Sequence, residues 1–167
     1  MMTIGITGGV GAGKSQVLTY IEENYNCKVI RADEVAHLLE EPGHKCYERI
    51  VAFLGTDILQ EDKTIDKRKM AAAIFTDEKK LIAINEILHP EVKTYILEQI
   101  QQESEKQEID FLFVEAALLI EEHYDEILDE IWYIHADTEV RSKRLKESRQ
   151  YSAEKIADIM GKQLSEE

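Results

Sequence analysis

The sequence contains little cysteine, and its two thiols follow no recognisable pattern. Cys27 and Cys46 are the two cysteines of the 167 residues, and their spacing matches neither a metal-ligand motif nor a redox motif. A single pair is also too few to hold together a small disulfide-rich domain. We therefore expect reduced thiols and a cytoplasmic protein.

Long apolar runs and an excess of basic residues are also lacking. No apolar run approaches the roughly 20 residues that a membrane-spanning helix needs. No basic segment precedes an apolar core at the N-terminus, so we expect neither a membrane span nor a signal peptide. The net charge of −14 argues against nucleic acid or an anionic membrane as the main partner. The remaining composition, with 44% hydrophobic and 32% charged residues, is typical of one globular domain.

The most informative stretch that is present lies close to the N-terminus. A β-branched, alternating segment from Thr3 to Thr7 leads into a glycine cluster that ends at Lys14 and Ser15. From Gly8 the spacing is G-x-x-x-x-G-K-S, which is typical of a phosphate-binding loop between a strand and a helix. Glycines let main-chain amides surround an anion, Lys14 adds a cation for the phosphates, and Ser15 offers a hydroxyl to Mg²⁺. The pattern predicts a nucleoside triphosphate site; the alternative is a glycine-rich turn that binds nothing.

The rest of the chain alternates strands and helices around one long helical stretch. We expect strands at 3–7, 28–33, 109–115 and 131–135, and helices at 14–25, 34–39, 46–54, 66–75, 77–103, 138–147 and 152–164. A kink or break is expected at His89-Pro90. Trp132 and Tyr133 alternate on an internal strand and are expected in the core.

This alternation predicts an α/β fold with a parallel sheet. Residues 34–104 contain helices alone, so we expect them to form an insertion at the carboxyl edge of the sheet. Ligands bind outside the carboxyl ends of the strands in such sheets. Asp33 and Glu115 each end a predicted strand, and we therefore expect both beside the glycine loop.

The class of nucleotide enzyme can be narrowed from the residues alone. The chain lacks the N-K-x-D motif that reads guanine, and it is too short for most motor ATPases. A small-molecule kinase fits best, with a helical insertion for the acceptor and an arginine-bearing lid near the end. Arg141, Arg144 and Arg149 lie in that lid region, where the planar guanidinium group suits developing phosphate charge.

Several blocks of the sequence resemble the dephospho-coenzyme A kinases. They include G-I-T-G-G-V-G-A-G-K-S at 5–15, A-D-E-V-A at 32–36, I-D-K-R at 65–68, N-E-I-L-H-P at 85–90 and L-L-I-E at 118–121. Shorter matches fall at 42–43, 53–59 and 74–75. The resemblance covers nearly the whole chain in the right order, and the blocks at 32–36 and 85–90 are much more specific than the nucleotide loop.

The resemblance implies a three-layer P-loop kinase fold in a single domain of residues 1–167. Its core would be about 1–33 and 105–136, its helical acceptor-binding insertion about 34–104 and its short lid about 137–167. The implied reaction moves the γ-phosphoryl group of ATP, with Mg²⁺, to the ribose 3′-hydroxyl of dephospho-coenzyme A in the last step of coenzyme A synthesis. The alternatives are another small-molecule or nucleoside monophosphate kinase, and a nucleotide-binding module with weakened catalysis.

The resemblance also assigns roles to individual residues. The catalytic residues would be Asp33, which would orient the attacking hydroxyl, with Lys14 and Arg144. The ATP-binding residues would be Gly9, Val10, Gly11, Ala12, Gly13, Lys14, Ser15, Gln16, Arg141 and Arg149, with Ser15 also holding the metal. The acceptor-binding residues would be Thr7, Asp33, Arg68, His89, Glu115 and Leu118.

Each of these assignments has a structural alternative. Asp33 could cap the helix after it, and Glu115 could be a solvated charge at a strand end. His89 could belong to a proline kink, and Arg68 to a surface salt bridge. The arginines of the lid could lie on a solvated helix face.

The chain departs from the family pattern in four places. Glu115-Ala116-Ala117 replaces an Asp-x-Pro block, Arg141 stands where glutamine is common, and the interval from Arg144 to Arg149 is one residue longer than usual. Family members also continue past Gln163 with another strand, a turn that helps to hold adenine, and a final helix. The given sequence ends four residues after Gln163, so we expect a naturally short or truncated chain with an exposed sheet edge and weaker adenine binding.

Overall fold

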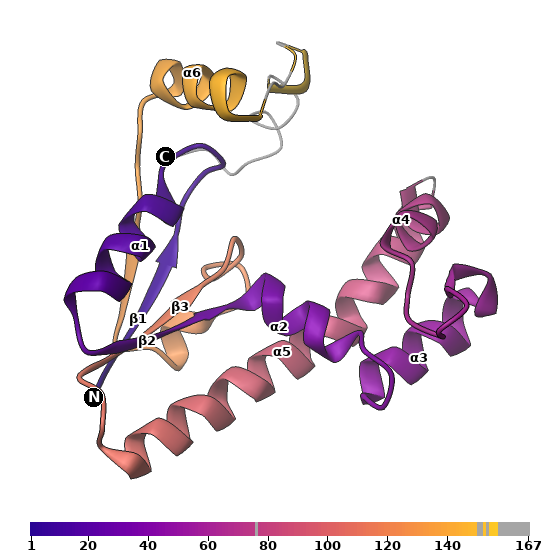
Figure 1. Ribbon diagram of the computed structural model, residues 1–167, viewed down its shortest axis with the longest axis horizontal. Coiled ribbons are helices and arrows are strands. Elements are labelled where there is room, and N and C mark those ends of the chain that lie inside the picture. Colours follow the sequence, from indigo (N-terminus) through magenta and orange to yellow (C-terminus); the bar gives the residue numbers. More distant parts are fainter. Residues whose placement is uncertain (76, 150–151, 153, 157–167) are drawn as a thin grey trace. The chain divides into compact units, whose positions relative to one another are not determined.

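The computed structural model describes residues 1–75, 77–149, 152 and 154–156. The chain forms two compact units, one made of Met1–Val29 with Glu103–Glu167 and the other of Ile30–Gln102 (Figure 1). The first unit contains most of the sheet, and the helices α2 to α4 all belong to the second. None of the helices in the described ranges is long and apolar enough to cross a membrane.

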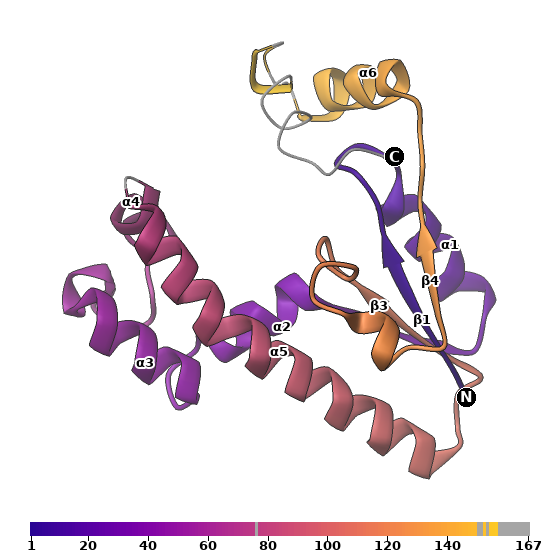
Figure 2. The same cartoon turned by 180° about the vertical axis from the view of Figure 1, so that it is seen from behind.

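The sheet has four strands in the order β2-β3-β1-β4. Its strands are β1 (Met2–Thr7), β2 (Cys27–Arg31), β3 (Phe111–Glu115) and β4 (Glu130–Tyr133). β1 lies between β3 and β4 and is parallel to both (Figure 2). In this register, Ile6 lies opposite Glu115 on one side and Trp132 on the other. The structure confirms the predicted α/β fold with a parallel sheet.

The core of the first unit is built on both faces of β1. Leu18 and Ile21 of α1 (Lys14–Asn24) pack against Ile4 and Ile6 on one face. On the other face, a Cβ at Gly5 would lie 2.8 Å from Leu119. Because β1 is covered on both faces, five consecutive residues of it are buried, and the polar Thr3 and Thr7 are among them.

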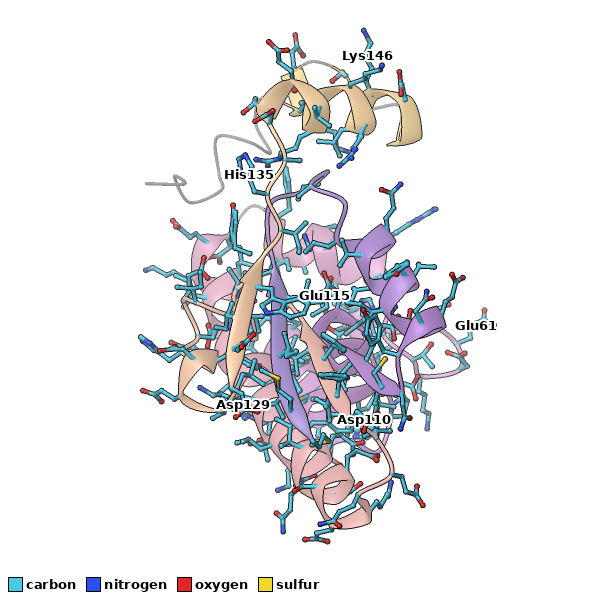
Figure 3. All side chains as sticks on the ribbon, turned by 90° about the vertical axis from the view of Figure 1, so that its left-hand side faces the viewer. Glu61, Asp110, Glu115, Asp129, His135 and Lys146 are labelled. Carbon is cyan, nitrogen blue, oxygen red and sulfur yellow. The ribbon has the colours of Figure 1, made fainter. Side chains whose placement is uncertain are left out.

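Two carboxylates form hydrogen bonds at the end of the sheet where the strands begin. The carboxylate of Asp129, just before β4, accepts bonds of 2.8 Å from both the main-chain amide and the hydroxyl of Thr3. These bonds lower the pKa of Asp129 below its ordinary value. Figure 3 shows Asp129 at the end of the sheet away from His135. The buried carboxylate of Glu103 likewise accepts bonds from Lys28 and Lys106, which lower its pKa.

The second unit is helical and has its own apolar cluster. Its helices are α2 (Ala32–Leu39), α3 (Lys45–Leu54), α4 (Lys67–Phe75) and α5 (Glu78–Lys106), whose last turn belongs to the first unit. The buried residues of the cluster are Cys46, Ile50, Ile58, Ile65, Ile84, Ile87 and Leu88. Side chains from α3, α4 and α5 together exclude water from this cluster, which holds the unit together.

Four local expectations are corrected or limited by the structure. A kink or break was expected at His89-Pro90, and the break is wrong, because α5 continues through Pro90 although proline removes one helical donor. The kink stays a prediction. β2 ends at Arg31, and Asp33 lies in α2 rather than at the end of the strand. Trp132 and Tyr133 are 40% and 47% exposed and not in the core, because β4 lies at an edge of the described sheet. Most of the predicted helix at 152–164 lies outside the described residues.

Candidate active site

The glycine loop joins the buried end of β1 to the first turn of α1. Gly8, Gly11 and Gly13 have φ angles of +141°, +82° and +106°, a region that side-chain-bearing residues avoid. A Cβ at Gly8 would also collide with the main-chain oxygen of Ile134. The local sequence therefore encodes this loop, and Lys14 begins the helix that follows it.

Every main-chain carbonyl from Gly8 to Gly13 accepts a hydrogen bond. Donors within the loop and α1 bond three of these carbonyls. Lys14 Nζ lies 2.7 Å from the oxygen of Gly8, and the amide of Ala12 donates to the oxygen of Gly9. The amides of Gln16 and Val17 donate to the oxygen of Gly13. The remaining three carbonyls are bonded by α6 (Thr138–Arg149). With its carbonyls bonded in this way, the loop can present amides to an anion.

Two arginines of α6 supply the donors for these three carbonyls. Arg141 Nε donates to the oxygen of Val10 at 3.1 Å. Arg144 Nη1 donates to Ala12 at 2.8 Å and to Gly11 at 3.3 Å. Positions 141, 144 and 145 share one face of a helix, and on this face Arg141 and Leu145 are 7% and 1% exposed. The predicted lid helix thus packs on the glycine loop in this structure.

A cavity of about 320 Å³ opens beside the loop. It is lined by residues 7–10, Lys14, residues 117, 118, 120 and 121, and Tyr133. The buried hydroxyl of Thr7 lies 3.3 Å from the oxygen of Ala117 and joins the two sides. The structure therefore brings together five predicted site residues: Thr7, Gly9, Val10, Lys14 and Leu118.

Five residues that line this cavity were missing from the assigned site residues: Gly8, Ala117, Ile120, Glu121 and Tyr133. Glu121 belongs to the block at 118–121 that resembles the family, and this was a signal that could have found it. Tyr133 carried no such signal, because alternation on a strand does not reveal which face borders a cavity. Glu115 ends β3 and is half-buried, and Figure 3 shows it labelled beside the central strands. It does not line the cavity.

Four further predicted site residues belong to the second unit or to the end of α6. Asp33 is exposed in the first turn of α2, whose N-cap is Arg31, so the capping alternative for Asp33 is wrong. Its charge still suits the positive end of a helix. Arg68 is exposed at the start of α4, and His89 is half-buried in α5. The side chain of Arg149 lies outside the described residues.

The sequence profile of one family, described as dephospho-CoA kinase, matches residues 2–167. This chain belongs to the dephospho-CoA kinase family. Curated relatives with that name include the protein from Oceanobacillus iheyensis, which is 32% identical over 98% of this chain and 81% of its own length. Another, from Listeria monocytogenes, is 34% identical over 97% of this chain and 80% of its own length. The predicted family is confirmed.

Solved structures show the same fold. TT1252 from Thermus thermophilus has a TM-score of 0.76 at 26% identity, covering 98% of this chain and 80% of that one. A dephospho-CoA kinase from Campylobacter jejuni has a TM-score of 0.65 at 22% identity, covering 93% and 77%. This chain therefore shares its fold with solved proteins.

Proposed function

We propose that this member of the dephospho-CoA kinase family transfers the γ-phosphoryl group of ATP to the ribose 3′-hydroxyl of dephospho-coenzyme A. The observation that carries the proposal is the glycine loop with its bonded carbonyls and Lys14 beside a cavity. The kinase activity follows from the family, whereas the site of phosphorylation and the residue roles are our assignments.

ATP would be held by the loop and the first turn of α1, residues 9–16. The first amides of a helix have no acceptor within the helix, and they point toward an anion at its N-terminus. Lys14 Nζ donates a hydrogen bond to the carbonyl oxygen of Gly8, and both residues line the cavity. The flexible side chain of Lys14 can turn from this carbonyl to the β- and γ-phosphates. The positive charge of Arg144 would stabilise the negative charge on the transferred phosphoryl group.

The hydroxyl of Ser15 would hold Mg²⁺ at this site. Ser15 is exposed in the first turn of α1, directly after Lys14. Among the described residues, no group of three or more His, Cys, Asp or Glu side chains could hold a metal. One hydroxyl with substrate phosphates and water suits Mg²⁺, which is seldom held by protein groups alone. When bound, the ion would neutralise charge between the β- and γ-phosphates.

Five residues would bind the acceptor in addition to Asp33. Thr7 and Leu118 line the cavity, and Glu115, Arg68 and His89 are assigned by the family resemblance. In the reaction, the 3′-oxygen bonds to the γ-phosphorus as the bond to the β-γ bridging oxygen breaks. ADP then leaves.

Asp33 would orient the hydroxyl of the acceptor and accept its proton. Phosphoryl transfer depends mainly on alignment and charge neutralisation, so orientation accounts for much of this role. We place the reaction in the cytoplasm, and the free thiols of Cys27 and Cys46 suit a reducing compartment. Small molecules would be its partners, and neither nucleic acid nor membrane is required.

The test is to incubate the chain with ATP, Mg²⁺ and dephospho-coenzyme A and to follow ADP and coenzyme A by mass spectrometry. Lys14→Ala should lower kcat/KM by about 10²-fold or more, because one charge at the transferred group is lost. Lys146→Ala is the matched control, since Lys146 is exposed on α6 (Figure 3). Product from a nucleoside monophosphate but not from dephospho-coenzyme A would contradict the acceptor, and turnover unaffected by Lys14→Ala would contradict the site.

A further inference from the structure

We propose that Arg141 is a positioning residue for the nucleotide loop, and that it acts through the N–H of its Nε atom rather than through its positive charge. This inference rests on the proposed function, because it assumes that the loop binds ATP. It differs from a role in direct phosphate contact, which would depend on the charge.

The loop needs donors on its carbonyl side. Its amides can face an anion while its carbonyls face elsewhere, and a buried carbonyl without a donor is destabilising. The carbonyl of Val10 lies in the middle of the loop, and Arg141 Nε donates to it at 3.1 Å. This bond joins positions 131 residues apart, so α6 has to be in place for the loop to be complete.

The burial of Arg141 distinguishes it from Arg144, its neighbour on the same helix face. Arg141 is 7% exposed, whereas Arg144 is exposed. The main chain at Arg141 also contacts the loop, because a Cβ at Gly11 would lie 3.1 Å from the oxygen of Arg141. With its main chain packed on Gly11 and its side chain bonded to Val10, Arg141 is suited to hold the loop in one conformation.

The identity of the bonding atom makes the proposal testable. Counted from Cα, the Nε of arginine is the fourth side-chain atom, and the Nε2 of glutamine occupies the same position. Arg141→Gln therefore keeps an N–H donor at this position and removes the charge. Arg141→Lys keeps the charge but has a carbon at this position, and Arg141→Met has similar length with neither donor nor charge.

The experiment is calorimetric titration of the full chain with ATP and Mg²⁺ for the wild type and these three variants. We expect Arg141→Gln to bind ATP about fivefold more tightly than Arg141→Met and Arg141→Lys, the value of about one hydrogen bond. In Arg141→Met and Arg141→Lys, KM for ATP should rise more than kcat falls, because the loop binds the substrate and the transition state equally well. Lys146→Gln, with the same change of charge on the exposed face of α6, should bind ATP as the wild type does.

Two outcomes would overturn the proposal. Tighter binding by Arg141→Lys than by Arg141→Gln would show that charge matters, and equal binding by Arg141→Gln and Arg141→Met would show that the donor does not. Circular dichroism checks that each variant folds. If Arg141→Met fails to fold, the ATP affinities of Arg141→Gln and Arg141→Lys still compare a variant that has a donor at this position with one that does not. A wild type that does not bind ATP would contradict the proposed function, a result distinct from equal binding among the variants.

Discussion

Arg144 Nη1 lies 2.8 Å from the main-chain oxygen of Ala12, so the arginine expected at the transferred phosphate bonds the loop that would hold ATP. The two roles are compatible. A guanidinium group has five N–H donors in a rigid plane, so the bonds from Nη1 to the loop do not use all of them. The contact makes α6 part of the support of the loop.

Gly11 provides a test of this packing. In Gly11→Ala, the new Cβ would lie 3.1 Å from both the oxygen of Arg141 and Cγ of Leu145, at a φ of +82°. Strain and crowding together should lower the free energy of unfolding by about 2–4 kcal/mol, measured by urea unfolding followed by circular dichroism. ATP binding should weaken about tenfold, because α6 would be displaced from the loop.

Gly43→Ala is the matched control for this prediction. Gly43 has a φ of +98° with nothing within 4 Å of an added Cβ, so the variant has the backbone strain without the crowding. Gly43→Ala should lower the free energy of unfolding by about 1–2 kcal/mol and leave the affinity for ATP unchanged. Equal losses in the two variants would show that α6 does not constrain the loop.

Asp33→Asn tests the assigned catalytic role. The substitution keeps the size of the side chain and removes the carboxylate, so kcat should fall by about 10²-fold or more while the Kd for ATP stays unchanged. Steady-state kinetics and calorimetry measure these two quantities. Glu34→Gln, an equal change of charge at the next exposed residue of α2, should alter kcat by less than about twofold. Unchanged turnover in Asp33→Asn would remove Asp33 from the mechanism.

Tyr133 tests whether the cavity takes the acceptor. Its ring lines the cavity, and Tyr133→Ala should raise KM for dephospho-coenzyme A by about threefold to tenfold, with little change in KM for ATP. Trp132→Phe is the control, because the preceding side chain on a strand points to the other face and its ring packs on Phe113 at 5.9 Å. A rise in KM for ATP alone would place the nucleotide, rather than the acceptor, beside Tyr133.

Asp129 predicts a pH dependence of stability. The amide and hydroxyl of Thr3 lower its pKa in the folded state below the ordinary 3.8. Asp129 therefore stabilises the fold at pH values above 3.8, and this contribution is lost as the pH falls through the lowered pKa. Asp129→Asn accepts similar bonds but does not titrate, so its stability relative to the wild type should rise as the pH is lowered from about 5.

Thr3→Val gives a graded version of this test. It removes the hydroxyl donor and keeps the main-chain amide, so it should reduce the pH dependence only in part. When Thr3→Val is combined with Asp129→Asn, it should cause almost no further change in the pH dependence of stability. Urea unfolding at several pH values measures these changes, and identical pH profiles for the wild type and Asp129→Asn would contradict the prediction.

Much of the fold and family could be predicted because the relevant signals are local. The nucleotide loop was predicted from thirteen consecutive residues, 3–15, because strand, glycines and helix start are adjacent in the chain. The roles assigned to Asp33, Arg68 and His89, and the division into core, insertion and lid, stay predictions, and Asp33→Asn tests the first of them. The break at Pro90 was wrong because a long helix tolerates the loss of one hydrogen bond when packing supports it.

By itself the sequence determined the glycine loop with Lys14 and Ser15, the parallel α/β pattern and the family, because backbone preferences and motif spacing act over short distances. The tertiary structure alone decided the bond from Arg141 to Val10, the bonds from Thr3 to Asp129 and the place of Tyr133 at the cavity. The bond from Arg141 to Val10 joins residues that are 131 positions apart, and the bonds from Thr3 to Asp129 join residues 126 positions apart. Tyr133 lies more than 100 positions from the loop residues that line the same cavity. Such contacts depend on which strands become neighbours, and that is settled by packing of the whole sheet rather than by any local stretch.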